Sequence, residues 1–147
     1  MATPFTFINA KIELSTDGGS TWTDISGSSN KLTPSGGEMR TSGTHPTGVE
    51  DPKLTAGGKE LINVAITAYY TETANEAREL LEDAYQNRKD ARVRWSPKGG
   101  NTGDKQVVTG AGYCTTPSFI GGEGGSSDAL MIDVVIVAET YTESTVA

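Results

Sequence analysis

Apolar and polar residues alternate over several short stretches of the chain, which is the pattern of half-buried β-strands. The clearest alternation covers residues 60–71, which are also rich in β-branched side chains. Residues 7–14 and 91–96 alternate in the same way. Residues 129–141 are apolar on both faces, which predicts a long final strand buried on both sides, within the subunit or against neighbouring subunits. Further short strands are predicted over residues 22–25, 105–111 and 113–120.

One stretch has the period of an α-helix instead. Apolar residues recur at helical spacing after Thr73, acidic residues lie in the first half and basic residues at the end, an order that complements the helix dipole. Thr73 and Glu76 have the spacing of a capping box. We predict one helix over about residues 74–89 that lies with its apolar stripe on a sheet.

Residues 27–59 show neither pattern. They contain Pro34, Pro46 and Pro52, many glycines and few large apolar residues, which predicts a long loop with at most one strand, over residues 38–44. So long a loop is usually functional or disordered. Because the hairpin before it is too small to fold alone, we do not interpret it as an interdomain linker, and we expect all 147 residues to form a single domain.

A local motif marks the turn of the first predicted hairpin. Ser15, Asp17, Gly19, Thr21 and Trp22 match the Asp-box pattern S-x-D-x-G-x-T-W. We expect the Asp carboxylate to accept N–H groups of the turn, the glycine to take a positive φ and the tryptophan to pack beneath. Sialidases carry one copy per propeller blade, but this chain has a single copy and is too short for a propeller, so we interpret the motif as a structural hairpin rather than a sugar site.

Composition adds two constraints. The chain is acidic, with a net charge of −7 and a pI of about 4.6, which disfavours a protein that wraps nucleic acid. Only 35% of residues are hydrophobic, so part of the apolar burial is expected to come from partner subunits. The single cysteine excludes an intrachain disulfide and suits a reducing cytoplasm. We see no signal-peptide pattern, and no membrane anchor is expected.

No catalytic or cofactor constellation is apparent. His45 is the only histidine, and it lies in a predicted loop. Cys114 has no nearby histidine and is expected to be a buried apolar residue. The glycine-rich pieces lack the strand–loop–helix context of a nucleotide site. The basic cluster over residues 88–98 is expected to pair with acids. We therefore predict no enzyme, no cofactor and no metal site.

The order of elements resembles the major tail tube proteins of long-tailed, siphovirus-type bacteriophages. The likeness is clearest over residues 59–95, KELINVAITAYYTETANEARELLEDAYQNRKDARVRW, and the layout agrees over nearly the whole chain. The resemblance implies a mainly β (α+β) fold, namely two packed antiparallel β-sheets (a β-sandwich or barrel) with one flanking α-helix.

In that family, six subunits close into a ring, and rings stack into a hollow tube around a tape measure protein, with terminator and baseplate proteins at its ends. DNA later passes through without specific binding. The resemblance thus implies a structural virion subunit of the tail, assembled in the host cytoplasm. It also implies that residues 27–59 reach the next ring.

Two groups of contact residues follow from the resemblance. The inter-ring candidates are Pro34, Glu38, Arg40, His45, Pro46, Asp51 and Lys53. The lumen in this family is commonly acidic, and an acidic lining repels DNA phosphates. The candidate lumen acids, which lie on predicted strands with polar alternation, are Glu13, Asp133 and Glu139.

Other functions are compatible with the sequence. A β-sandwich module that binds carbohydrate or protein would explain the Asp box and the Gly/Ser/Thr content, although the single cysteine argues against a secreted protein. Another tail component, such as a terminator or baseplate ring protein, would share the same layout. A small hydrolase is the weakest alternative, because no acid, base and oxyanion site can be assembled.

Overall fold

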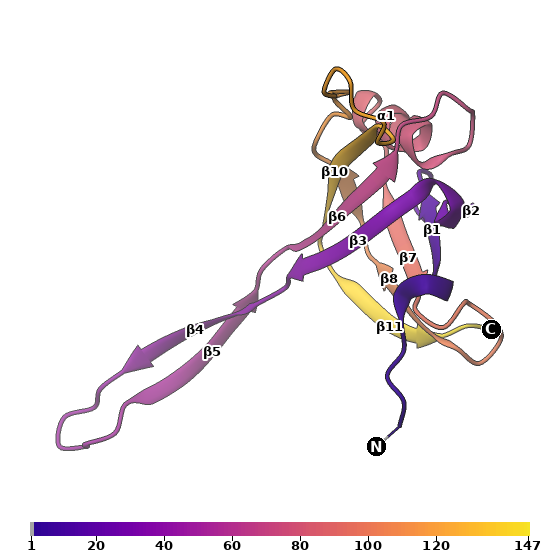
Figure 1. Cartoon of the computed structure of the whole chain (residues 1–147). Coiled ribbons are helices and arrows are strands. Elements are labelled where there is room, and N and C mark those ends of the chain that lie inside the picture. The colour runs from indigo at the N-terminus through magenta and orange to yellow at the C-terminus, as the bar shows by residue number, and fades with distance from the viewer. Residues whose placement is uncertain (1) are drawn as a thin grey trace.

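The computed structural model describes residues 2–147 and is mostly β-structure with one α-helix (Figure 1). A five-stranded antiparallel sheet has the order β11-β8-β7-β1-β2. Its strands are β1 (Lys11–Ser15), β2 (Thr23–Asp24), β7 (Arg92–Ser96), β8 (Lys105–Thr109) and β11 (Tyr141–Thr145). A four-stranded antiparallel sheet has the order β3-β6-β10-β9. Its strands are β3 (Ser29–Gly36), β6 (Ile62–Tyr69), β9 (Gly112–Cys114) and β10 (Met131–Ala138).

One core joins the two sheets and the helix. Alternate side chains of β6 and β10 point inward, and those of β1 and β7 meet them from the five-stranded sheet. Helix α1 (Ala77–Gln86) adds Ala77, Leu81 and Ala84, all fully buried. Two short 3₁₀ turns, η1 (Phe7–Asn9) and η2 (Ser26–Ser28), flank the first hairpin. The expected fold class, two packed antiparallel sheets with one flanking helix, is confirmed.

Most of the alternating stretches contain strands. Residues 60–71 and 91–96 contain β6 and β7, as predicted. In the stretch over residues 7–14, however, Phe7–Asn9 forms the 3₁₀ turn η1, and only the second part belongs to β1. Strand β10 was expected to be buried on both faces, within the subunit or against neighbours. Within the subunit its inward residues are buried, while Met131 and Asp133 on the other face are exposed and Val135 and Val137 are half-buried. Burial of this outer face against neighbouring subunits stays a prediction.

Helix α1 is shorter than the predicted helix over residues 74–89. The capping box of Thr73 and Glu76 does not form, because Asn75 takes a positive φ of 64° and the N-cap position has no side-chain hydrogen bond. Instead, the Ala77 N–H donates to Ser28 Oγ at 3.0 Å. The start of the helix is thus satisfied by a residue of η2, far away in the sequence.

The predicted loop over residues 27–59 consists mainly of strands. After β3, residues 37–60 form a second antiparallel hairpin of β4 (Met39–Thr44) and β5 (Lys53–Lys59), which projects far from the body (Figure 1). The strand expected over residues 38–44 corresponds to β4. Every residue of β4 and β5 is exposed, so no hydrophobic alternation marks these strands in the sequence.

Candidate functional site

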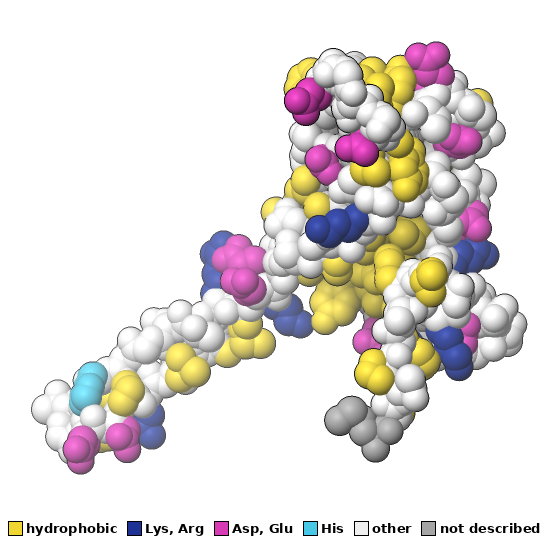
Figure 2. Space-filling model, viewed as in Figure 1, with side chains coloured by type: hydrophobic (Ala, Val, Ile, Leu, Met, Phe, Trp, Pro, Cys, Tyr) yellow, Lys and Arg dark blue, Asp and Glu magenta, His cyan; other side chains and the backbone are white. Residues whose placement is uncertain are grey.

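The β4–β5 hairpin, residues 39–59, is an arm with no packing partner among residues 2–147. Its two strands contain six and seven residues, all exposed. Apolar side chains are nevertheless present, and Leu54 is 75% and Met39 52% exposed. They appear as isolated hydrophobic patches along the arm in Figure 2. An isolated two-stranded hairpin is only marginally stable in water when neither face is packed. The exposed apolar side chains of the arm therefore suggest that it contacts another molecule.

The base of the arm continues the hydrogen-bond ladder of β3 and β6. The Gly37 N–H donates to Leu61 O at 3.0 Å, and the Glu60 N–H donates to Glu38 O at 2.8 Å. Gly36 and Gly37 have φ values of 82° and 70°, which favour glycine. A Cβ on Gly36 would also overlap with the Leu61 carbonyl oxygen. The arm is therefore a bent continuation of the four-stranded sheet rather than a loose loop.

An ion pair between Arg40 on β4 and Glu60, the residue after β5, joins the two sides of the arm at its base. Arg40 Nε donates to Glu60 Oε1 at 2.5 Å and Arg40 Nη2 to Glu60 Oε2 at 3.2 Å. This hydrogen bonding lowers the pKa of Glu60 and raises that of Arg40. Arg40, a candidate for inter-ring contact, is thus already engaged within its own arm.

The tip of the arm, residues 45–52, is a tight turn with acidic residues. His45 Nε2 lies 2.6 Å from Val49 O, and the Val49 N–H donates to Pro46 O at 3.3 Å. Glu50 and Asp51 are exposed, and neither forms an ion pair within the described part of the chain. Of the expected inter-ring residues, five lie on the arm, namely Arg40, His45, Pro46, Asp51 and Lys53, whereas Pro34 lies on β3 and Glu38 just before β4.

Both sheets have open edges. In the four-stranded sheet these are β3 and β9, and in the five-stranded sheet β11 and β2. Within residues 2–147, no further strand pairs with their outer sides. Unpaired edges offer N–H and C=O groups to another chain, and proteins normally cover or shorten them. The eight-residue β3 is the longest of these edges.

The outer face of the four-stranded sheet carries mostly uncharged side chains, with the cation Lys31 on β3 beside Thr67. On β6 and β10 it presents Ala65, Thr67, Asp133, Val135 and similar residues, because their neighbours in sequence point into the core. Asp133 is exposed, and its Oδ1 accepts a hydrogen bond from Thr67 Oγ1 at 2.6 Å. Asp133 is the only acidic residue of β6 and β10 on this face.

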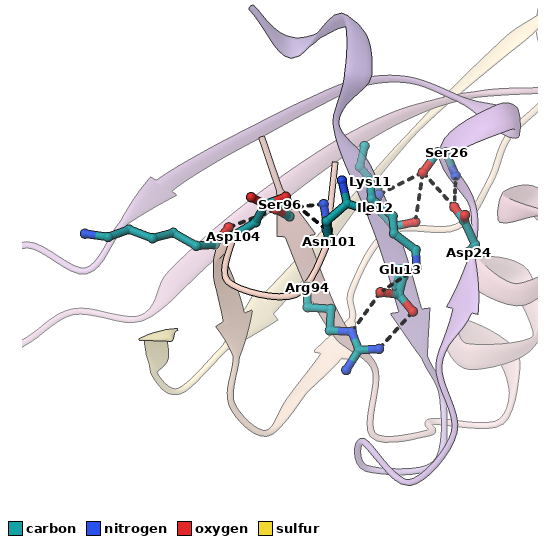
Figure 3. Close-up of polar contacts among 11 residues, drawn as sticks. Lys11, Ile12, Glu13, Asp24, Ser26, Arg94, Ser96, Asn101 and Asp104 are labelled. Atoms are coloured by element: carbon teal, nitrogen blue, oxygen red, sulfur yellow. Dashed lines mark hydrogen bonds and ion pairs between the residues drawn. The ribbon is translucent and has the colours of Figure 1, made fainter. Parts of the chain in front are cut away.

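The structure does not bring the three candidate lumen acids together. Glu13 lies on β1 in the other sheet, where Arg94 Nε and Nη2 donate to its two carboxylate oxygens at 3.0 and 2.9 Å (Figure 3). Only 14% of the Glu13 side chain is exposed. Asp133 lies on the outer face of the four-stranded sheet, and Glu139 is exposed just after β10. Glu13 is therefore part of a cross-strand ion pair, separate from the other two acids.

The Asp-box hairpin forms as predicted. Asp17 Oδ1 accepts hydrogen bonds from the Thr21 N–H at 2.9 Å and the Ser15 hydroxyl at 2.7 Å. These bonds lower the pKa of Asp17 from 3.8 to about 2. Gly19 has a φ of 93°, and Trp22 lies half-buried under the Arg94 guanidinium, 4.5 Å from the ring centre. Ser15, Asp17 and Thr21 thus form hydrogen bonds with one another, which supports a structural role for the motif.

The basic cluster mostly pairs with acids, as predicted. Its ion pairs are Lys89–Asp83, Arg92–Asp90, Arg94–Glu13 and Lys98–Asp104. Arg88 is the exception, since its side chain has no ion pair or hydrogen bond within residues 2–147.

Residues with nucleophilic or metal-binding chemistry are isolated. Burial raises the pKa of Cys114 to about 11, so its thiol is protonated at neutral pH. Within residues 2–147, no group of His, Cys, Asp and Glu could hold a metal ion. The only described α-helix, α1, is too short and too polar to cross a membrane. The arm, the open edges and the outer sheet face are therefore the features that suggest a function.

No family model and no curated relative matches the sequence. Several solved structures are similar to the structure of this chain. A chain of the anti-feeding prophage baseplate is 12% identical with a TM-score of 0.73, and the match covers 99% of this chain and 99% of that chain. A chain in the tail of a gene transfer agent particle, refined with C6 symmetry, is 10% identical with a TM-score of 0.68, covering 95% and 96%. A chain of the sheath–tube complex of an extracellular contractile injection system is 12% identical with a TM-score of 0.68, covering 97% and 93%.

The chain has a tail-tube-like fold. Each of these structural matches covers almost the whole of this chain and of the matched chain. The similarity therefore includes the projecting arm. The matched structures are parts of tubes, caps, terminators and baseplates, and the fold alone does not distinguish among these positions.

Proposed function

We propose that this chain is a single-domain structural subunit of a phage tail, which assembles into hexameric rings that stack as the hollow tail tube. The observation that carries the proposal is the arm, residues 39–59, whose strands are exposed along their entire length. An arm that packs on nothing in its own chain gains its packing when it lies against another copy. The tail-tube-like fold supports the same conclusion.

Ring closure would use the open edges of the four-stranded sheet. The edge β3 of one copy would pair with the β9 side of the next, which removes both free edges. Six four-stranded sheets give a barrel of about 24 strands. At about 4.8 Å per strand and a tilt near 40°, the backbone diameter is roughly 48 Å. Inward side chains reduce this by about 10 Å, and the remaining bore still admits a DNA duplex.

The outer face of the four-stranded sheet would then line the bore, because its other face is buried in the core. This lining is nearly neutral, with Asp133 as its acidic residue and Glu139 close to its edge. Mostly uncharged side chains and a few repelling carboxylates would let DNA pass without binding. Glu13 is assigned no place in the lumen, since it is paired with Arg94 in the other sheet.

The partners follow from this assignment. A tape measure protein would fill the bore during assembly, and terminator and baseplate proteins would close the two ends. The siphovirus-type tail is proposed on the sequence resemblance over residues 59–95. A place in a terminator or baseplate ring is the alternative within the same fold.

The test is negative-stain microscopy and size-exclusion chromatography of the full-length protein. Tubes or six-fold rings are expected at high concentration. A variant in which Met39–Lys59 is replaced by Asn-Gly keeps Glu38 and Glu60 as the last pair of a tight hairpin. It is expected to fold and to form rings that do not stack. A wild-type chain that stays monomeric at all concentrations would refute the proposal.

A further inference from the structure

The second residue after helix α1 has an unfavourable backbone conformation. Arg88 has a φ of 51°, and the Lys89 N–H donates to Ala84 O at 3.0 Å. This is the helix-ending geometry in which glycine, or else asparagine, normally occupies the left-handed position. An arginine with this backbone is strained. Strain of this kind persists where a side chain is needed for function.

The side chain of Arg88 lies at a recess on the surface of the body. The recess, of about 550 Å³, is lined by Tyr85, Gln86, Arg88, Tyr113 and Cys114. Tyr113 on β9 is 58% exposed, and Tyr85 is half-buried against the core. Aromatic residues and an arginine line the same recess, and such a lining can hold an apolar residue and a carboxylate together.

Charge also distinguishes this arginine from the others. Arg40, Arg78, Arg92 and Arg94 each have an ion-pair partner, whereas Arg88 has none within residues 2–147. Arg88 is exposed, so its guanidinium is solvated in the isolated chain and is available to bind a carboxylate of another molecule.

The tip of the arm offers the matching chemistry. Glu50 and Asp51 are adjacent, exposed carboxylates without an ion pair in the described chain, and the apolar residues Val49 and Pro52 flank them. The arm projects away from the body, so the tip cannot reach the recess of its own chain (Figures 1 and 2). A neighbouring copy can supply it.

We propose that the Glu50–Asp51 tip of one copy docks in the Arg88–Tyr85–Tyr113 recess of another copy. This inference rests on the proposed function and assigns the receptor of the arm. The contact joins two different surfaces of the same chain, so it is head-to-tail and continues from copy to copy. Such a contact extends a stack without limit.

Charge reversal with rescue tests this contact in the full-length protein. Arg88→Glu is expected to reduce tube yield at least about tenfold, since two like charges then face each other. Glu50→Lys with Asp51→Lys is expected to do the same. The combination of all three substitutions is expected to restore tubes. A matched control replaces Arg88→Glu by Lys105→Glu, which reverses an exposed cation on β8, a strand that is not at a sheet edge, and should not rescue the tip variant.

Arg88→Gly gives a second, independent readout. Glycine relieves the positive φ, so the melting temperature is expected to rise, while tube yield falls. A purely structural Arg88 would not separate stability from assembly in this way. Normal tubes from Arg88→Gly and Arg88→Glu, or no rescue by the triple variant, would overturn the docking site while leaving the tube subunit intact. A wild-type chain that forms neither rings nor tubes would overturn both proposals.

Discussion

Arg94 and Glu13 form a bidentate ion pair between β7 and β1, with hydrogen bonds of 3.0 and 2.9 Å. The pair is mostly shielded, because 28% of the arginine side chain and 14% of the glutamate side chain are exposed. The Arg94 guanidinium also lies on the Trp22 ring. One arginine thus connects the first hairpin with the second half of the five-stranded sheet.

Glu13→Gln is accordingly expected to lower the free energy of unfolding by about 1–2 kcal/mol, because it weakens two charge-assisted hydrogen bonds. Urea denaturation measures this change. Glu143→Gln is the matched control, since its pair with Lys105 is exposed on both sides and should contribute less than about 0.5 kcal/mol. Equal effects of the two substitutions would contradict the role given to the shielded pair.

The Asp-box turn is expected to make stability depend on pH at acidic values. Hydrogen bonds from Thr21 and Ser15 lower the pKa of Asp17 from 3.8 to about 2. Because the folded-state pKa is below the unfolded one, the stabilisation by Asp17 is complete above about pH 4 and is lost as the pH falls through about 2.

Asp17→Asn should therefore lower the melting temperature at pH 7, and the difference from wild type should shrink between pH 4 and pH 2. Thermal unfolding followed by circular dichroism at several pH values measures it. A difference that stays constant over this range would show that the ionised carboxylate is not what stabilises the turn.

Two adjacent serines near the start of helix α1 are expected to differ in their effect on stability. Ser28 Oγ accepts the buried Ala77 N–H at 3.0 Å, whereas Ser29 Oγ is buried without a hydrogen-bond partner. Ser28→Ala should cost about 1–2 kcal/mol in unfolding free energy, because it leaves an N–H group unsatisfied. Ser29→Ala should be neutral or slightly stabilising. The reverse order in denaturant titrations would contradict this assignment of the cap.

The junction between body and arm depends on glycine. Gly36→Ala should destabilise the protein by at least about 1–2 kcal/mol, because a side chain is strained at positive φ and its Cβ would overlap with Leu61 O. Gly43→Ala on β4 is the control, since nothing lies within 4 Å of a Cβ there and its φ is not positive. Differential scanning calorimetry of both variants measures this difference, and equal melting temperatures would contradict the role given to Gly36.

Cys114 should be nearly inert in the folded protein. Its thiol is buried and its pKa is raised to about 11, so the thiolate fraction at pH 8 is about 100-fold lower than that of an ordinary thiol. Titration with a thiol reagent should show slow modification in buffer and rapid modification in denaturant. Fast labelling of the native protein would mean that β9 opens readily from the sheet.

Local patterns in the sequence predicted local structure well. Alternation identified β6 and β7, and the spacing of Ser15, Asp17 and Thr21 identified a turn whose side-chain hydrogen bonds lie within the motif. These features depend on residues close together in the chain, and they report directly on burial or on turn geometry.

Features that depend on distant residues were missed. The cap of α1 comes from Ser28, which is 49 residues before Ala77. Glu13 looked like a lumen acid because it faces away from the core, but its partner Arg94 lies 81 residues later. The strands β4 and β5 lack alternation because neither face is buried in the single chain.

The length of the arm is adjustable, because β4 and β5 pair only with each other and pack on nothing else in the described chain. Adding two residues to each arm strand would extend it by about 7 Å and keep every side chain on its original face, because strands repeat every two residues. Adding one residue would turn the tip over. A designer could thus change the reach of the tip in steps of one strand repeat, without altering a single residue of the core.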